Sequence, residues 1–236
     1  MTKNQTEQKK ILAVKAANFV EPGMLLGLGT GSTVDIFIST LGEKFGGLNN
    51  LEIVPTSLDS ADKASKLGMK ILEPKTDLRP DLLIDGADEV AADLSMIKGG
   101  GGALLWEKIV AHNSKSRIYM ADSTKLVREL GHFPLPVEVI SFGHEWTYIA
   151  LKKIFSVVTI RKTAGENFFK TNSGNVIYDC QIGGDIRIDV LDSDLCQIPG
   201  VVTSGLFYDF VDILLTVHNE NAVSYTHLTL PTILLV

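Results

Sequence analysis

The chain has 236 residues, of which 45% are hydrophobic, 7% aromatic and 21% charged. These proportions are ordinary for a globular protein and exclude a disordered, collagen-like or fibrous chain. The formal net charge is −6, and the 22 lysines and arginines are scattered along the sequence, so we expect no nucleic-acid partner.

The amino-terminal segment is the first element along the chain. Residues 1–10 are largely polar, without the apolar region of a secretory signal, and no stretch approaches the roughly 18 consecutive apolar residues of a membrane span. We therefore expect a cytoplasmic protein without a membrane partner. Residues 11–19 predict a helix, which ends before the Glu-Pro-Gly of residues 21–23.

The first half of the chain alternates strand-like apolar runs with helical patterns. This alternation indicates an α/β protein with a mostly parallel, Rossmann-like sheet. Small or polar residues follow each strand, and because the carboxyl ends of parallel strands share one edge of the sheet, we expect these clusters to converge there. The predicted strands are residues 24–28, 51–55, 81–84 and 117–120, and the predicted helices are residues 34–41, 60–66 and 103–111.

The second half follows the order of a split βαβ, ferredoxin-like unit. We expect residues 133–205 to form a smaller inserted α+β domain, a lid or oligomerisation domain, within a larger α/β domain of residues 1–132 and 206–222. The cysteines, Cys180 and Cys196, lack the spacing of a metal site or a disulfide framework. The predicted strands here are residues 137–141, 157–161, 176–181 and 201–207, the helices are residues 144–154 and 191–198, and a last strand of the larger domain is residues 211–217.

A glycine-rich loop follows the first strand and opens a helix. Residues 27–33 read GLGTGST, so the N–H groups at the helix start and the hydroxyls of Thr30, Ser32 and Thr33, on either side of Gly31, can bind an anion such as phosphate. Ser32 stands where the dinucleotide fingerprint has its third glycine, which argues against a nicotinamide cofactor. The loop could instead be an ordinary tight turn in which Ser and Thr cap the helix.

Two carboxylates follow the third strand on one turn. Asp85 and Asp88 flank Gly86 and Ala87, and like charges this close raise each other's pKa. Such pairs are typical of sites where protons move or sugar hydroxyls are bound. The alternative is an aspartate that caps the next helix.

A lysine and four glycines precede the helix at residues 103–111. The run is Lys98, Gly99, Gly100, Gly101 and Gly102, and consecutive glycines favour a backbone that approaches a ligand closely. Glu107 lies in the early turns of that helix, so it is a candidate general base, although a lone helical glutamate is more often solvated. Lys125, after the fourth strand, is a further candidate site residue or an ordinary surface lysine.

Taken in order, these motifs resemble ribose-5-phosphate isomerase of the A type. The resemblance extends from about residue 9 to about residue 222. It rests on GLGTGST at residues 27–33, DGADE at 85–89, IKGGGGAL at 97–104 followed by Glu107 and Lys108, FPLPVEV at 133–139 and IPGVV at 198–202.

The resemblance implies the role of each candidate residue. Glu107 would be the proton acceptor, with Asp85 and Lys98 as further catalytic residues, and Lys9 would lie near the phosphate. Trp106 departs from the family, which commonly has arginine there. The remaining sugar-phosphate ligands would be Thr30, Gly31, Ser32, Thr33, Gly86, Ala87, Asp88, Gly99, Gly100, Gly101 and Lys125.

The implied activity is the interconversion of ribose 5-phosphate and ribulose 5-phosphate through an enediolate, in the non-oxidative pentose phosphate pathway. No metal or other cofactor is expected, and the resemblance implies a homodimer or homotetramer. An alternative is a non-catalytic sugar-phosphate sensor on the same scaffold, which would be expected to carry a DNA-binding segment. A nicotinamide-dependent oxidoreductase is disfavoured by the incomplete fingerprint.

The carboxyl-terminal residues 223–236 do not resemble the family. Residues 223–232 read VSYTHLTLPT, which one reading frame of a sequencing-library adapter would encode, so we expect a foreign tail outside the fold. The edge after the strand at residues 211–217 would then be poorly covered, and Tyr225, Leu228 and Leu230 would be exposed.

Overall fold

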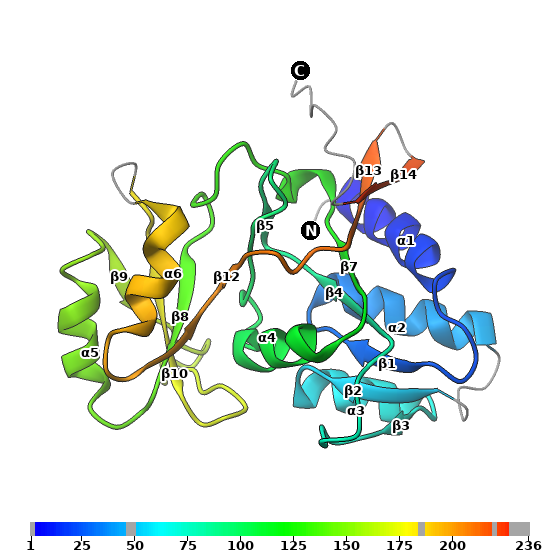
Figure 1. The fold of residues 1–236 in the computed structure, drawn as a ribbon, viewed down its shortest axis with the longest axis horizontal. Coiled ribbons are helices and arrows are strands. Elements are labelled where there is room, and N and C mark those ends of the chain that lie inside the picture. The colour runs from blue at the N-terminus through cyan, green and yellow to red at the C-terminus, as the bar shows by residue number, and fades with distance from the viewer. Residues whose placement is uncertain (1–2, 46–50, 184–186, 219–220, 227–236) are drawn as a thin grey trace.

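The computed structural model describes residues 3–45, 51–183, 187–218 and 221–226. Its larger part is a seven-stranded sheet in the order β14-β13-β7-β4-β1-β2-β3, in which every pair is parallel except β13 with β14 (Figure 1). These strands are β1 (Leu25–Leu28), β2 (Glu52–Pro55), β3 (Lys70–Ile71), β4 (Leu82–Gly86), β7 (Arg117–Met120), β13 (Ile213–His218) and β14 (Asn221–Thr226).

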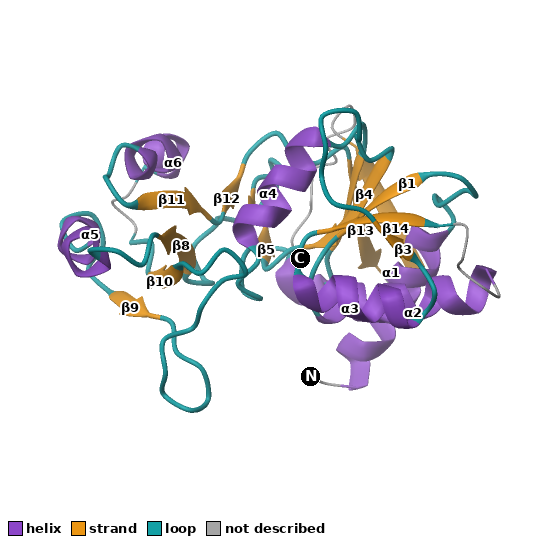
Figure 2. Cartoon of the chain, turned by 90° about the horizontal axis from the view of Figure 1, so that it is seen from below, coloured by secondary structure: helices purple, strands orange, loops and turns teal. Residues whose placement is uncertain are grey.

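Helices cover both faces of this sheet. Side chains alternate along a strand, so Leu82 and Ile84 of β4 join the cluster under α1, α2 and α3, whereas Leu83 packs with Val110 of α4 on the opposite face. Figure 2 shows α1, α2 and α3 on one side of the strands and α4 on the other. The helices are α1 (Lys3–Ala17), α2 (Ser32–Phe45), α3 (Leu58–Lys66) and α4 (Leu104–Asn113).

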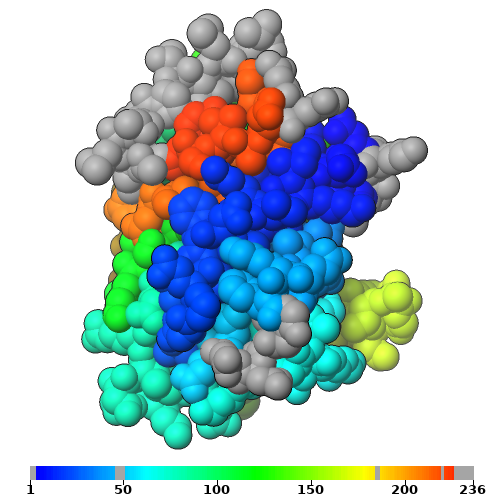
Figure 3. Space-filling view, turned by 90° about the vertical axis from the view of Figure 1, so that its right-hand side faces the viewer, coloured from blue at the N-terminus to red at the C-terminus, as the bar shows by residue number. Residues whose placement is uncertain are grey.

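Helix α1 is longer than predicted, because it begins at Lys3 rather than at residue 11. Its first turns are polar and carry no apolar stripe that would indicate a helix in the sequence. Leu12, Ala13 and Ala16 bury its second half against α2 and the sheet. Figure 3 shows α1, in dark blue, lying between α2 and the orange β13–β14 pair. No helix in the described ranges is long and apolar enough to cross a membrane.

The smaller sheet is antiparallel and has the order β11-β8-β10-β9. Strand, helix, strand, strand, helix, strand is the connectivity predicted for a ferredoxin-like unit, and the predicted fold class is confirmed. The limits of the inserted domain, residues 133 and 205, stay a prediction. The elements are β8 (Leu135–Val139), α5 (His144–Leu151), β9 (Val158–Ile160), β10 (Val176–Cys180), α6 (Ile188–Cys196) and β11 (Val201–Ser204).

The strand predicted at residues 201–207 is interrupted at Gly205, and this prediction was wrong. β11 belongs to the smaller sheet, whereas β12 (Leu206–Phe207) pairs with β6 (Met96–Ile97) in a third sheet that also contains β5 (Glu89–Val90). At the break the backbone of Gly205 presses against Lys98, since a Cβ there would lie 2.3 Å from the Lys98 carbonyl oxygen. The N–H of Lys98 donates to the Gly205 carbonyl at 2.9 Å.

The expectation that the sheet edge beside β13 is poorly covered was also wrong. Residues 223–226 form most of β14, which pairs with β13 from Ile213 to His218. The unpaired backbone groups of an edge strand accept any extended segment, and Val223 and Tyr225 suit a strand. Tyr225 is half-buried against the core. Leu228 and Leu230 lie outside the described residues.

Candidate active site

One pocket lies among the polar loops at the carboxyl ends of β1 and β4. It is lined by Lys9, Thr30, Gly31, Ser32, Thr33, Gly86, Ala87, Asp88, Lys98, Gly99, Gly101, Glu107 and Lys125. All the predicted site residues other than Asp85 and Gly100 are therefore brought together. Asp85 is fully buried and contacts Lys98, whereas Gly100 is exposed on the glycine loop but does not line the pocket.

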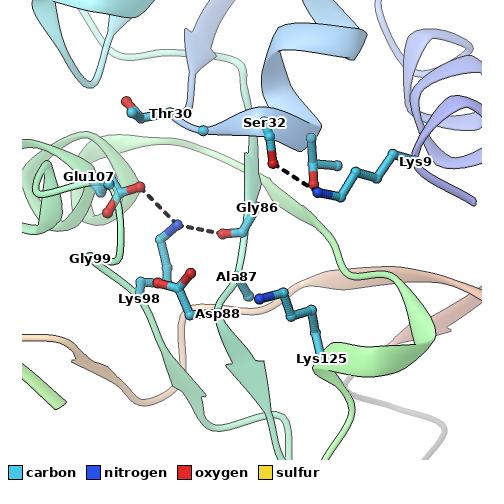
Figure 4. A pocket seen from close by; sticks show the side chains of 13 residues that line it. Lys9, Thr30, Ser32, Gly86, Ala87, Asp88, Lys98, Gly99, Glu107 and Lys125 are labelled. Atoms are coloured by element: carbon cyan, nitrogen blue, oxygen red, sulfur yellow. Dashed lines mark hydrogen bonds and ion pairs between the residues drawn. The ribbon is translucent and has the colours of Figure 1, made fainter. Parts of the chain in front are cut away.

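The start of α2 forms one end of the pocket. Lys9 reaches across from α1 and its Nζ donates to Ser32 Oγ at 2.8 Å (Figure 4). Lys9 is buried, which lowers its pKa, while the charge of Asp122 opposes that shift. Lys125, from the 3₁₀ turn Ser123–Lys125, extends into the pocket below Lys9 in Figure 4. Two cations and the free N–H groups of a helix start favour an anion here.

Thr30 lines the pocket, but its hydroxyl has hydrogen-bond partners in the turn between β2 and α3. It lies 2.7 Å from Thr56 Oγ1 and donates to Ser57 Oγ at 2.8 Å, in a buried cluster completed by Ser60. Ser60 Oγ in turn donates to the Gly29 carbonyl at 2.6 Å. These hydroxyls hold the turn of the loop, so Ser32 and Thr33 are the hydroxyls left for an anion.

The opposite end of the pocket holds a buried group of three charged side chains. Lys98 Nζ lies 2.9 Å from Asp85 Oδ2 and 3.1 Å from Glu107 Oε1, and it donates to the Gly86 carbonyl at 2.5 Å. The exposed fractions of the Asp85, Lys98 and Glu107 side chains are 0%, 2% and 5%. The aromatic rings of Tyr119 and Phe207 also face the ammonium, with centroids 5.5 and 5.6 Å away.

Burial sets the protonation of these groups. Removal from water raises the pKa of Glu107 to about 8, helped by the charges of Asp85 and Asp88 and opposed by Lys98. Burial also raises the pKa of Asp85, against the pull of Lys98. The two carboxylates outweigh the burial of Lys98 and hold its pKa well above the usual range, so Lys98 stays an ammonium.

The glycine loop faces Asp88. The N–H of Gly100 donates to Asp88 Oδ2 at 2.7 Å, and the Asp88 N–H donates to the Ile97 carbonyl at 2.9 Å. A Cβ on Gly100 would lie 2.7 Å from Asp88 Oδ1, so a larger residue would push this carboxylate away. Asp88 lines the pocket, whereas Asp85 does not.

Comparisons with known proteins place the chain in a family. The family model for ribose 5-phosphate isomerase A (phosphoriboisomerase A) matches residues 52–221. The ribose-5-phosphate isomerase A of Parvibaculum lavamentivorans is 46% identical over 214 residues, which cover 86% of this chain and 91% of that protein. That of Listeria monocytogenes is 42% identical over 88% and 93% of the two chains. The chain belongs to the ribose 5-phosphate isomerase A family.

Solved structures of this family superpose on the chain. Ribose 5-phosphate isomerase A of Methanocaldococcus jannaschii has a TM-score of 0.86 at 33% identity and covers 94% of this chain and 99% of its own. A D-ribose-5-phosphate isomerase in complex with phospho-erythronic acid has a TM-score of 0.85 at 34% identity, with coverage of 96% and 100%.

The smaller sheet contacts the glycine loop of the site, and the sequence did not indicate these contacts. Arg161 donates to the carbonyls of Gly99 and Gly100, and Asp179 holds Arg161. Trp106 donates from Nε1 to Ser173 Oγ at 3.0 Å and so links α4 to the turn before β10. Neither Arg161 nor Asp179 stands in a motif, and no local signal marks them.

Proposed function

We propose that the chain interconverts ribose 5-phosphate and ribulose 5-phosphate, with Glu107 as the base. The observation that carries this proposal is that Glu107 lines the same pocket as the anion-binding end. Its Oε1 contacts Lys98, whereas its buried Oε2 has no hydrogen-bond partner among the described residues. A buried carboxylate with one oxygen open to a ligand can accept a proton.

The reaction requires one proton to move between two carbons. The ionised Glu107 takes the proton from C2, the C–H electron pair forms the C1–C2 double bond, and the carbonyl pair moves to O1. A proton then passes from O2 to O1, and Glu107 returns its proton to C1 while the carbonyl forms at C2. Because one carboxylate serves both carbons, it must lie close to each.

Lys98 is placed to stabilise the charge that develops on O1 and O2. It remains cationic and buried, where a charge acts more strongly than in water. Asp85 does not line the pocket, so we assign it a positioning role. It holds Lys98 and the backbone of Thr30, whose N–H donates to Asp85 Oδ1 at 3.1 Å. Asp88, which faces the pocket, would hold the sugar hydroxyls and assist ring opening.

The phosphate would bind at the start of α2, between Lys9 and Lys125. It is remote from the reacting carbons, so its binding energy can orient the open-chain sugar rather than take part in the chemistry. The protein can bind an anion although its net charge is −6, because the two lysines act at short range whereas salt screens the more distant charges.

A coupled assay of ribulose 5-phosphate formation tests the function. Ribose 5-phosphate should be converted, unphosphorylated ribose should be a very poor substrate, and inorganic phosphate should compete with the substrate. Comparable kcat/KM for the two sugars would rule out the phosphate assignment. Binding of ribose 5-phosphate without turnover would support a sensor instead.

We further propose that the chain forms homo-oligomers in the cytoplasm. Phe142, Trp146 and Ile149, on and just before α5, are 83%, 76% and 57% exposed, and an apolar surface can pair with the same surface of a second copy about a two-fold axis. The free thiol of exposed Cys196 is typical of a reducing compartment. Light scattering should show an oligomer that Trp146→Glu weakens; a monomeric parent chain would contradict this.

A further inference from the structure

Arg161 links the smaller sheet to the glycine loop. It directly follows β9, and its Nη1 donates to the Gly99 carbonyl at 2.8 Å and to the Gly100 carbonyl at 3.2 Å. Its Nε donates to Asp179 Oδ2 at 2.9 Å, and its Nη2 pairs with the other oxygen of Asp179 in β10. The guanidinium is thus held on one side by a bidentate carboxylate and on the other contacts the loop backbone.

The glycine loop depends on such external contacts for its shape. Gly99 and Gly102 have positive φ values of +99° and +80°, which side chains rarely adopt. Phe169 occupies the space beside Gly102, where a Cβ would lie 2.3 Å from its ring, and its own ring lies 5.9 Å from the Arg161 guanidinium. Arg161 and Phe169, neither of which lines the pocket, therefore fix the shape of the loop.

The bonds of Arg161 determine where the loop N–H groups point. In a trans peptide the N–H points away from the carbonyl, and no cis peptide occurs in the described residues. The Gly99 carbonyl faces Arg161, and the Gly100 N–H of the same peptide faces Asp88 at 2.7 Å. The Gly100 carbonyl also faces Arg161, so the Gly101 N–H of that peptide points to the opposite side, and Gly101 lines the pocket.

We propose that Arg161 is a positioning residue for isomerisation, held by Asp179, which orients the Gly101 N–H toward the reacting oxygens and the Gly100 N–H toward Asp88. The proposal rests on the proposed function. A cation on the carbonyl side of a peptide also polarises it and makes its N–H a stronger donor. Because charge develops on the sugar oxygens only during the reaction, this contribution acts on turnover more than on binding.

Arg161→Gln tests the proposal, with Lys162→Gln as the matched control. Lys162 is the next residue and pairs with exposed Glu166, so its variant loses a charge without touching the loop. Arg161→Gln should lower kcat about 10- to 100-fold, while the KM and the inhibition constant of inorganic phosphate change less than twofold. Binding of a phosphorylated four-carbon aldonic acid should weaken, and Arg161→Lys should recover part of kcat, since an ammonium can still donate to one carbonyl.

The outcomes separate this inference from the function itself. A parent chain without isomerase activity overturns the proposed function, whatever the variants do. If the parent is active and Arg161→Gln has the same kcat as the Lys162→Gln control, the inference is overturned. It is also overturned if Arg161→Gln changes the KM and the inhibition constant of phosphate together and leaves kcat unaltered. If Arg161→Gln does not fold, Asp179→Asn, which keeps the side-chain volume, should give the same selective loss of kcat; an unchanged kcat there also overturns it.

Discussion

Glu107, the proposed base, is the residue whose charge state matters most in the proposed mechanism. There it would have to be a carboxylate to accept the proton and an acid to return it. Its surroundings bring these states close in free energy, because burial and two neighbouring aspartates favour the acid while Lys98 favours the anion. Lys98 itself is locked as a cation between two carboxylates, so it can serve as a fixed charge while Glu107 changes.

Replacing Glu107 by glutamine should abolish isomerisation and preserve substrate binding. The amide is nearly isosteric but cannot accept the C2 proton, so we expect kcat to fall at least about 10²- to 10⁴-fold, the usual contribution of a positioned base. Calorimetry with a phosphorylated pentose analogue measures the retained binding. Glu145→Gln, an exposed helical glutamate of α5, is the control. Activity of the Glu107 variant within tenfold of the parent would exclude Glu107 as the base.

The pH dependence of activity should reflect the raised pKa of Glu107, which is about 8. The proposed mechanism requires the ionised form of this group in the free enzyme, so kcat/KM should fall as the pH drops below about 8, approaching tenfold per pH unit. A series of rate measurements from pH 5.5 to pH 9 checks this. A profile that stays flat down to pH 6 would contradict a base with a raised pKa.

The same shift should make stability depend on pH. The pKa of Glu107 is raised from 4.5 to about 8 on folding, so the folded state binds its proton more tightly than the unfolded state. This contribution is fully present below about pH 4.5 and is lost as the pH rises toward 8. Glu107→Gln lacks it, so its Tm relative to the parent should increase between pH 5 and pH 8. If the Tm difference between Glu107→Gln and the parent does not change with pH, the Glu107 carboxyl lies in a more polar environment and its pKa is not raised.

Helix α1 contributes to the phosphate end of the site as well as to the core. Lys9→Met should raise the KM for ribose 5-phosphate and the inhibition constant of inorganic phosphate about tenfold and leave kcat within about threefold, because Lys9 contacts the loop at Ser32 and lies far from the base in Figure 4. Lys10→Met, the exposed neighbour on α1, is the matched control. Equal effects of the two variants would show only a general loss of positive charge.

The four central parallel strands were predictable from the sequence. Each is an apolar run followed by small or polar residues, and this pattern marks its position directly. The residues 117–120 coincide with β7, and the other three predicted strands differ from β1, β2 and β4 by at most two residues at an end. The short strands β3, β5 and β6 were missed, since pairs of residues carry no periodicity.

The part of the site that lies in loops at the carboxyl ends of the strands was predictable. The glycine loop, the aspartate turn and Glu107 meet because parallel strands share an edge. The bonds of Arg161 and the turned hydroxyl of Thr30 depend on contacts between segments far apart in sequence, which no local pattern contains.

At the scale of the whole molecule, β14 completes the sheet, and its removal should destabilise the protein. A chain ending at residue 220 lacks β14, whereas a chain ending at Thr226 keeps it and serves as the matched control. We expect the shorter chain to unfold several degrees lower, because β13 loses its outer partner and Tyr225 leaves the core. Equal Tm values would show that β14 adds nothing. The foreign origin of residues 223–236 stays a prediction.

The direction of β14 has an evolutionary consequence. Six strands of the sheet run parallel, and a further parallel strand would need a crossover of a dozen or more residues, whereas an antiparallel neighbour can return through a short turn. The unpaired backbone N–H and C=O groups of an edge strand can pair with any extended segment, so many sequences with alternating apolar residues can occupy the position. Over evolution, we therefore expect this outermost position to tolerate substitutions as long as an extended segment with alternating apolar residues follows β13.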